Sequence, residues 1–372
     1  FNTYFLEDWI FKTDYANEKI KDHFKTATLK GFGIDNLPLG IITSGAILYY
    51  LELTEHNDIQ HISRISRIEE EKYVWLDKFT IRNLELIFPQ HETGVPLINI
   101  LDDTVTPMGG RLLKKWVLLP LKDRAPIEER LKIVRDFSKN DELEEEYLKH
   151  LKPIGDLERL ISKVAARRIN PRELLQLKRA LILLVPIKQN LAKSKEASLQ
   201  ALASRINLCK FLRDKIENEL REDPPLLANQ GNIIKEGIHE ELDELRKISL
   251  SGKDYLRQIQ EREAERTGIP KVKISYNKVF GYYLEVSNAH KDKVPEEWIR
   301  KQTLVNAERF ITPELKEYEE KIITAEEKIG RIEQELFANL IIAAGDFVRE
   351  IQANARIIAP VSYTHLTLPT TP

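Results

Sequence analysis

Residues 313–351, PELKEYEEKIITAEEKIGRIEQELFANLIIAAGDFVREI, carry the pattern that decides the fold. Apolar side chains recur there every three or four positions, which is the near-heptad spacing of a helix that packs along another helix. The members of this seam are Leu315, Tyr318, Ile322, Ala325, Ile329, Ile332, Leu336, Leu340, Ala343, Phe347 and Ile351. The pattern predicts one long returning helix over residues 313–358.

Residues 233–268 offer the partner for this helix. Their apolar positions are Ile234, Ile238, Leu242, Leu245, Leu256 and Ile259. Ser249 and Gly252 interrupt the stripe and predict a kink. At 1.5 Å per residue, a helix of about 35 residues is roughly 50 Å long, more than a globular domain requires. We therefore expect two antiparallel helices that form a stalk.

The segment between these helices, residues 269–312, has a different period. Polar and apolar residues alternate over 271–276 and again over 282–287, and residues 277–281 form a turn-like break between them. This arrangement predicts a small β module at the tip of the stalk.

The β module is locally basic, although the chain as a whole is not. The chain has 57 Lys and Arg against 59 Asp and Glu, a net charge of −2, so no global excess indicates a nucleic-acid partner. Residues 269–312 hold eight basic and five acidic residues, a local charge of +3. Such a surface can bind DNA phosphates without reading bases. The alternatives are a sheet whose charges only keep it soluble, and base stacking on Tyr282 and Tyr283.

The rest of the chain is predicted to be mainly α. A charged fraction of 31% with only 15 Gly favours long solvated helices. Residues 36–232 have helical apolar spacing, with Pro126, Pro171 and Pro186 where helices start or stop, and one strand-like stretch near 73–87. We expect a helical core bundle there.

No catalytic, cofactor or metal site is predicted. The sequence has no GxxxxGK[ST] phosphate loop, its eight His are scattered, and Cys209 has no second Cys to form a thiolate metal site. We interpret Cys209 as a small core residue in a reducing compartment. The longest uncharged stretch, residues 36–51, is too short to span a bilayer, so a soluble intracellular protein is expected.

Four blocks of sequence carry a resemblance to a known family. They are LKGFG (29–33); RNLEL (82–86) with TPMGGRLL (106–113); DLERL (156–160) with PREL (171–174); and GYY (281–283) with QTL (302–304), NAER (306–309) and PELK (313–316). On these blocks the chain resembles the middle of a bacterial DNA mismatch repair protein of the MutS family, from about residue 1 to residue 358.

The resemblance implies a domain order. Residues 1–35 would end the connector domain, 36–232 would be the core, 233–268 and 313–358 the levers, and 269–312 the clamp. In the family, the clamps of two subunits close around double-stranded DNA and contact its backbone, while ATP-driven changes at the far ends of the levers open and close the ring. The partners implied are therefore duplex DNA, a second subunit and a MutL-type repair protein, in the bacterial cytoplasm.

The resemblance also implies the residues that touch DNA. By position in the matching clamp motif they are Asn277, Lys278, Lys301, Gln302, Thr303, Asn306 and Arg309. Val305 stands where some relatives carry a Lys, which removes one expected phosphate contact.

Two functional parts of the family are not expected in this chain. Phe5-Leu6-Glu7 matches the letters of the Phe-x-Glu mismatch-reading motif, but it lies in connector-like sequence and is interpreted as a coincidence. No enzymatic activity is expected from the fragment, and ATP with Mg²⁺ would belong to the ATPase domain. Residues 359–372 depart from the family pattern and are predicted to be a foreign tail.

Two other classes of protein remain as alternatives. A chromosome-maintenance type of structural protein would use a coiled-coil stalk with a dimerising tip. The MutS relatives that lack a clamp would lack the β module at the stalk tip.

Overall fold

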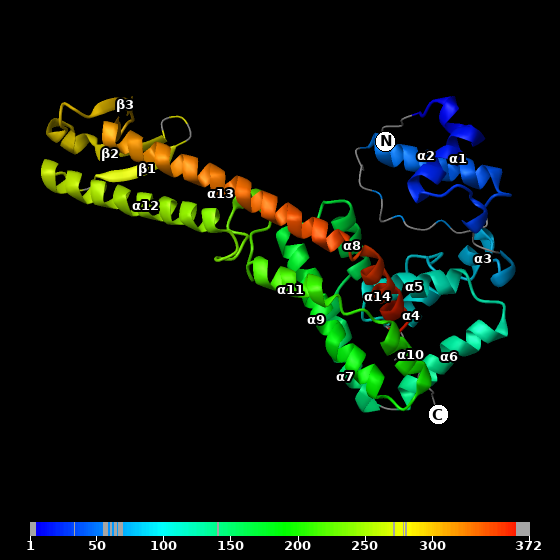
Figure 1. Ribbon diagram of the computed structural model, residues 1–372. Coiled ribbons are helices and arrows are strands. Elements are labelled where there is room, and N and C mark those ends of the chain that lie inside the picture. The colour runs from blue at the N-terminus through cyan, green and yellow to red at the C-terminus, as the bar shows by residue number, and fades with distance from the viewer. Residues whose placement is uncertain are drawn as a thin grey trace. The chain divides into compact units, whose positions relative to one another are not determined.

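The computed structural model describes residues 5–32, 34–54, 59, 62, 65, 70–139, 141–270, 272–277, 279 and 281–361. The chain divides into two compact units (Figure 1). The first combines Phe1–Asn218 with Leu340–Pro372, and the second is Glu219–Asn339. The described part is mainly helical and contains one four-stranded antiparallel sheet, which confirms the predicted fold class. Of the predicted foreign tail, residues 359–361 instead complete the last helix, where Ala359 is buried, and the residues beyond 361 lie outside the described ones.

The N-terminal helices of the first unit pack on each other. The elements are η1 (Asp8–Phe11), α1 (Thr13–Phe24), η2 (Lys30–Phe32) and α2 (Pro38–Leu53). Ala16 and Ile20 of α1 share a buried cluster with Ile41 and Leu48 of α2. The domain boundary expected at residue 35 therefore falls between two helices that share one core, because α2 buries its apolar side chains against α1.

The prediction of a strand near residues 73–87 is wrong. The elements of this region are η3 (Glu70–Lys72), α3 (Lys78–Asn83), α4 (Leu97–Leu101) and α5 (Pro107–Leu118). Asp77 caps α3 by accepting a hydrogen bond from Thr80 N at 2.7 Å, which starts a helix inside the apparent alternation. Among the described residues of 73–87, strand pairing is confined to the isolated bridge of Tyr73 with Leu121.

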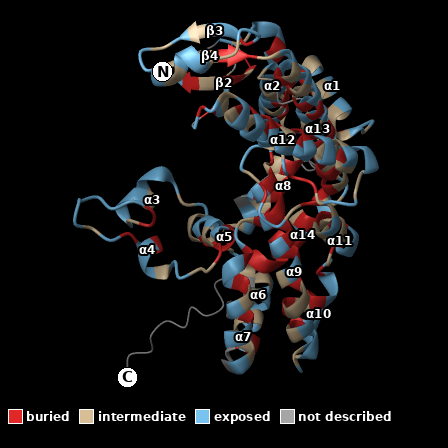
Figure 2. Ribbon diagram, turned by 90° about the vertical axis from the view of Figure 1, so that its left-hand side faces the viewer, coloured by how far each residue is buried: buried red, intermediate tan, exposed pale blue. Residues whose placement is uncertain are grey.

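The expected helical bundle forms the centre of the first unit. Its elements are α6 (Arg124–Ser138), α7 (Asp141–Leu151), η4 (Lys152–Ile154), α8 (Leu157–Ala165), α9 (Pro171–Lys193), α10 (Ala197–Arg205), α11 (Lys210–Glu219) and α14 (Val348–Val361). Asn170 and Glu173 form a capping box at the start of α9. Pro186 lies inside α9 rather than at a helix end. Buried residues of α8, α9 and α14 make the core (Figure 2).

The second unit is built on two long helices. Leu220 and Ile234, on either side of η5, form an isolated bridge, and His239 caps α12 by accepting from Leu242 N. Helix α12 therefore begins later than residue 233, where the sequence predicted it. Its elements are η5 (Ala228–Gln230), α12 (Glu240–Thr267), β1 (Lys273–Asn277), β2 (Gly281–Ser287), η6 (Asn288–Lys293), β3 (Ile299–Thr303), β4 (Ala307–Ile311) and α13 (Pro313–Gly345).

Helices α12 and α13 pair antiparallel, as predicted. Lys253 pairs with Glu326, and further along α12 the Tyr255 hydroxyl donates to Glu314 at 2.7 Å. Figure 1 shows the two helices side by side, with the sheet at one end of the pair. The returning helix is nevertheless not continuous to residue 358. It ends at Gly345, and α14 follows from Val348, because Gly and Asp at 345–346 are poor helix formers.

The interruption of the apolar stripe at Ser249 and Gly252 does not break the helix. Helix α12 runs unbroken through both positions, and both residues are buried. A Cβ at Gly252 would lie 2.6 Å from Ile322 Cγ1, so the small residues allow α12 and α13 to approach closely.

Gly252→Ala should lower the free energy of unfolding by about 1–3 kcal/mol, because the added methyl overlaps Ile322 and forces the helices apart. The matched control is Gly330→Ala on α13, where a Cβ has open space and should raise stability by roughly 0.5–1 kcal/mol. Urea unfolding followed by circular dichroism checks both variants. An equal change in the free energy of unfolding for both variants would contradict the close approach of α12 and α13 at Gly252.

Candidate nucleic-acid interface

The sheet has one covered face and one free face. The strands lie in the order β1-β2-β4-β3. Leu284, Val286 and Phe310 pack in one cluster with Leu256 of α12 and Leu315 of α13. Because side chains alternate along a strand, the residues between them point to the opposite face. Sequence alternation predicted this amphipathic arrangement.

The two hairpin turns lie at opposite ends of the sheet. Asn277 pairs with Gly281, so the β1–β2 turn is at the start of β2. Ser287 pairs with Ala307, so the β3–β4 turn is at the end of β2. At roughly 3.3 Å per residue, the seven residues of β2 separate the turns by about 20 Å. The predicted DNA contacts therefore do not form one cluster.

Asn277 lies at the β1–β2 turn and is half-buried. Its side-chain Oδ1 accepts a hydrogen bond from Val279 N at 2.7 Å, which stabilises the turn. Lys278, the next predicted contact, lies outside the described residues.

Arg309 and Gln302 are brought together on the free face. Arg309 Nη1 donates to Gln302 Oε1 at 2.9 Å, and Arg309 Nε donates to Glu285 Oε2 at 3.0 Å. The guanidinium also lies over the ring of Tyr283, 4.4 Å from its centroid. The charge of Arg309 is thus already paired within the sheet, and the side chain links β2, β3 and β4.

The tyrosines considered for base stacking are held inside the second unit. Tyr283 is only 5% exposed beneath Arg309. Tyr282 packs against the core cluster and against Tyr276, with ring centroids 5.0 Å apart. Tyr283 is thus covered and Tyr282 is partly buried, so neither ring is a free stacking platform.

Lys301 lies on a β-bulge in the edge strand β3. Arg300 pairs with Phe310 and Gln302 pairs with Arg309, so Lys301 between them has no partner in β4. Its side chain is exposed. Because the bulge leaves this residue out of the ladder, Lys301 is available to a ligand outside the sheet.

Thr303 and Asn306 are exposed at the β3–β4 turn. The turn is closed by Leu304 N, which donates to Ala307 O at 2.8 Å. Two hydrogen bonds join it to the start of η6: Asn288 N donates to Asn306 O at 3.1 Å, and Asn288 Nδ2 donates to Val305 O at 2.9 Å. Thr303 and Asn306 are therefore the predicted contacts that the fold brings to this end of the sheet, while Lys301 lies midway along β3.

Gly281 is required by a close contact with α13. Its φ is +76°, and a Cβ there would lie 1.9 Å from Glu319 Oε1. The buried Glu319 carboxylate accepts a hydrogen bond from Tyr282 N at 3.0 Å. Sequence reasoning found the GYY motif but missed Glu319, because nothing local marks a residue 38 positions away as its partner.

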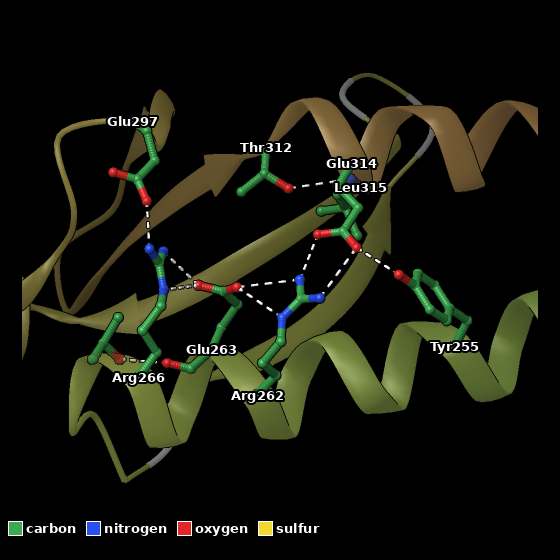
Figure 3. Close-up of polar contacts among 9 residues, drawn as sticks. Tyr255, Arg262, Glu263, Arg266, Glu297, Thr312, Glu314 and Leu315 are labelled. Atoms are coloured by element: carbon green, nitrogen blue, oxygen red, sulfur yellow. Dashed lines mark hydrogen bonds and ion pairs between the residues drawn. The ribbon is translucent and has the colours of Figure 1, made fainter.

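A network of charged side chains attaches the sheet to the stalk (Figure 3). Arg266 Nε donates to the buried Glu263 at 2.9 Å, and Arg266 Nη1 donates to Glu297 at 2.6 Å. Arg262 pairs with Glu314 in the first turn of α13. Hydrogen bonds from Arg262, and then from Tyr255, hold the pKa of the Glu314 carboxyl below its ordinary value of 4.5.

Glu314→Gln should remove a stabilising charge interaction that depends on pH. A carboxyl whose pKa is lowered by folding stabilises the protein above pH 4.5, and this contribution is lost as the pH falls through the lower folded value. We expect the variant to be less stable at pH 7 by about 1 kcal/mol or less, since the pair is partly exposed. Urea unfolding at pH 7 and pH 3 measures this. The free energies of unfolding of the two proteins should become equal at pH 3. The same difference at pH 3 as at pH 7 would contradict the ion pair.

The described residues contain no group of three or more His, Cys, Asp or Glu that could hold a metal ion. Within the same residues, no helix is long and apolar enough to cross a membrane. The candidate site is therefore the polar, locally basic sheet of the second unit.

Two family models match the chain, and they define its class. MutS domain III matches residues 79–361, and MutS domain II matches residues 1–63. The chain belongs to the MutS family. The domain II match extends to residue 63, in agreement with the packing of α2 on α1.

Curated relatives with the name DNA mismatch repair protein MutS are similar over almost the whole chain. The protein of Cytophaga hutchinsonii is 60% identical over 97% of this chain, and that of Bacteroides thetaiotaomicron is 55% identical over 96%. The protein of Flavobacterium psychrophilum is 52% identical over 99%. These alignments cover 42%, 42% and 43% of the relatives, so the chain spans about two fifths of their length.

Proposed function

We propose that this chain is the part of a DNA mismatch repair protein that holds duplex DNA through its backbone phosphates. The observation that supports this most directly is Lys301, an exposed cation on a bulge of a locally basic sheet, in a chain of the MutS family. The name of the relatives indicates the process, DNA mismatch repair, and the residues indicate the mode of binding.

The chemistry of the exposed residues suits phosphate rather than bases. The Lys301 ammonium, the Thr303 hydroxyl and the Asn306 amide can all donate to phosphate oxygens. Such contacts fix the position of a duplex and carry no sequence information. The clamp would therefore bind DNA of any sequence, and recognition of a mismatch would belong to another domain.

Arg309 and Gln302 serve this function indirectly in our proposal. Their contacts with each other and with Glu285 hold β3 against β4 and thereby fix the bulge that presents Lys301. They were expected to touch DNA directly, and a direct contact by Arg309 would require it to leave Glu285.

The other properties of the whole protein are proposals that follow from the family resemblance. ATP and Mg²⁺ would bind in its ATPase domain, since the present sequence has no GxxxxGK[ST] motif. The stalk helices α12 and α13 would relay the ATP-driven change to the clamp. The whole protein would act as a homodimer in the bacterial cytoplasm, together with a MutL-type partner.

The competing reading, a tip that serves dimerisation, receives no support from the free face of the sheet. Beside the exposed Ile299, that face carries Lys273, Glu285, Gln302 and Arg309, which are polar or charged. Dimerising surfaces are depleted in charge at their centre. Tip-to-tip crosslinks that persist without DNA would favour the dimerising tip instead.

Lys301→Ala should weaken binding of the 372-residue chain to duplex DNA and make it less sensitive to salt. Loss of one phosphate contact reduces the slope of log affinity against log salt by about 0.9. Fluorescence anisotropy with a labelled duplex measures the slope, and the change should be the same for matched and mismatched duplexes.

The control for this variant is Lys247→Ala, which removes an exposed lysine from α12 and should leave the slope unchanged. An unchanged slope for Lys301→Ala, or a loss restricted to one sequence, would overturn the phosphate assignment.

A further inference from the structure

We propose that a groove in the first unit binds an acidic peptide of a partner protein, in which carboxylate and apolar side chains are neighbours. The groove lies between η4, α8 and α9 and has a volume of about 730 Å³, within the range of ligand-binding pockets. Its lining residues all belong to the first unit, whereas the DNA contacts proposed above belong to the second.

The groove has an apolar lining and is open to solvent. Ile154 and Leu160, which line it, are buried, and Ile182, which also lines it, is 42% exposed. Exposed residues border the groove on both sides, Pro153 from η4 and Gln176 from α9. An extended chain can enter such an open groove, and an apolar side chain of that peptide would cover Ile182.

Helix α9 presents one polar side to the groove. Glu173, Gln176, Arg179 and Leu183 all line it, at spacings of three, three and four residues, which place them on the same side of the helix. Arg159 lines the groove from α8. The groove therefore carries an arginine from each of two helices.

The two carboxylates that line the groove are already bound. Arg111 donates to both oxygens of Asp156, at 2.7 and 2.8 Å. Glu173 pairs with Lys163 and accepts a hydrogen bond from Asn170 N at 3.2 Å. These contacts fix both carboxylates and leave neither of them to bind the groove arginines.

The two arginines of the groove are not neutralised. Among the described residues, neither the Arg159 nor the Arg179 guanidinium forms an ion pair or a hydrogen bond. Arg159 is attracted only by Asp156, whose oxygens Arg111 holds. The lining charges and their ion-pair partners comprise four cations and three carboxylates: Arg111, Arg159, Lys163 and Arg179 against Asp156, Glu158 and Glu173. The groove therefore favours an anion.

The combination of guanidinium groups with an apolar lining favours a peptide over a nucleic acid. A guanidinium binds a carboxylate through two parallel hydrogen bonds. Surfaces that bind DNA are more polar and much more positive than protein interfaces, whereas the charges at this groove sum to only +1. A peptide with aspartate next to leucine satisfies both the arginines and the apolar lining.

The experiment measures binding of two labelled peptides to the 372-residue chain by fluorescence anisotropy. One peptide is eight residues of alternating aspartate and leucine, and the other has asparagine in place of each aspartate. The aspartate peptide should bind, and the asparagine peptide should bind roughly tenfold more weakly, because it lacks the charge that the arginines recognise.

Arg159→Ala and Arg179→Ala should each weaken binding of the aspartate peptide about fivefold, because each removes one exposed ion pair with the peptide. The control is Arg331→Ala, which removes an exposed arginine of α13 in the second unit and should leave binding unchanged.

Ile182→Ser should weaken binding of the same peptide roughly threefold, because an apolar contact is lost. The matched control is Ile248→Ser on α12, where the isoleucine is 49% exposed and lies outside the groove. Because both side chains are substantially exposed, both variants should fold, which circular dichroism checks.

The proposal has three outcomes that would overturn it. They are equal binding of the two peptides, no binding of either up to about 1 mM, and equal effects of the groove variants and their controls. A labelled duplex serves as the last probe and should bind the Arg159→Ala and Arg179→Ala variants as it binds the unsubstituted chain. If these variants lose duplex binding but keep peptide binding, the groove is a nucleic-acid site instead.

Discussion

The second unit depends on the contact between the sheet and the two stalk helices. A sheet that is apolar on one face must bury that face against another element. Its apolar face is covered by side chains of α12 and α13, which meet Leu284, Val286 and Phe310 in one cluster. The helices in turn approach closely only because Gly252 leaves room for Ile322. Stalk and sheet therefore share one buried core.

Buried carboxylates specify the register of this contact. Glu333 of α13 pairs with Arg246 of α12, and Glu319 of α13 binds the backbone at the start of β2. A buried carboxylate without its partner is costly, so a shift of α12 along α13 would strand Glu333, and a shift of the sheet along α13 would strand Glu319. The apolar seam alone would tolerate such a shift, because a near-heptad pattern repeats along its length.

Sequence reasoning predicted those features that depend on local periodicity. The antiparallel stalk and the amphipathic sheet follow from spacings of three to four and of two. Two of the misread positions depended on a cap or on a distant residue. Asp77 starts a helix where alternation indicated a strand, and Gly252 lies against Ile322 of the distant helix α13. Among the predicted contacts, strand register alone separates Asn277 from Asn306, and no local pattern reveals register.

The bulge at Lys301 has a consequence for the solubility of the protein. Strand β3 is at the edge of the sheet, and an exposed edge presents unpaired N–H and C=O groups that can pair with a strand of another molecule. The bulge breaks the regular spacing of these groups, and the lysine places a charge beside them. The same residue that is available to a phosphate thus also blocks the extension of the sheet from one molecule into the next, which protects the chain against aggregation through this edge.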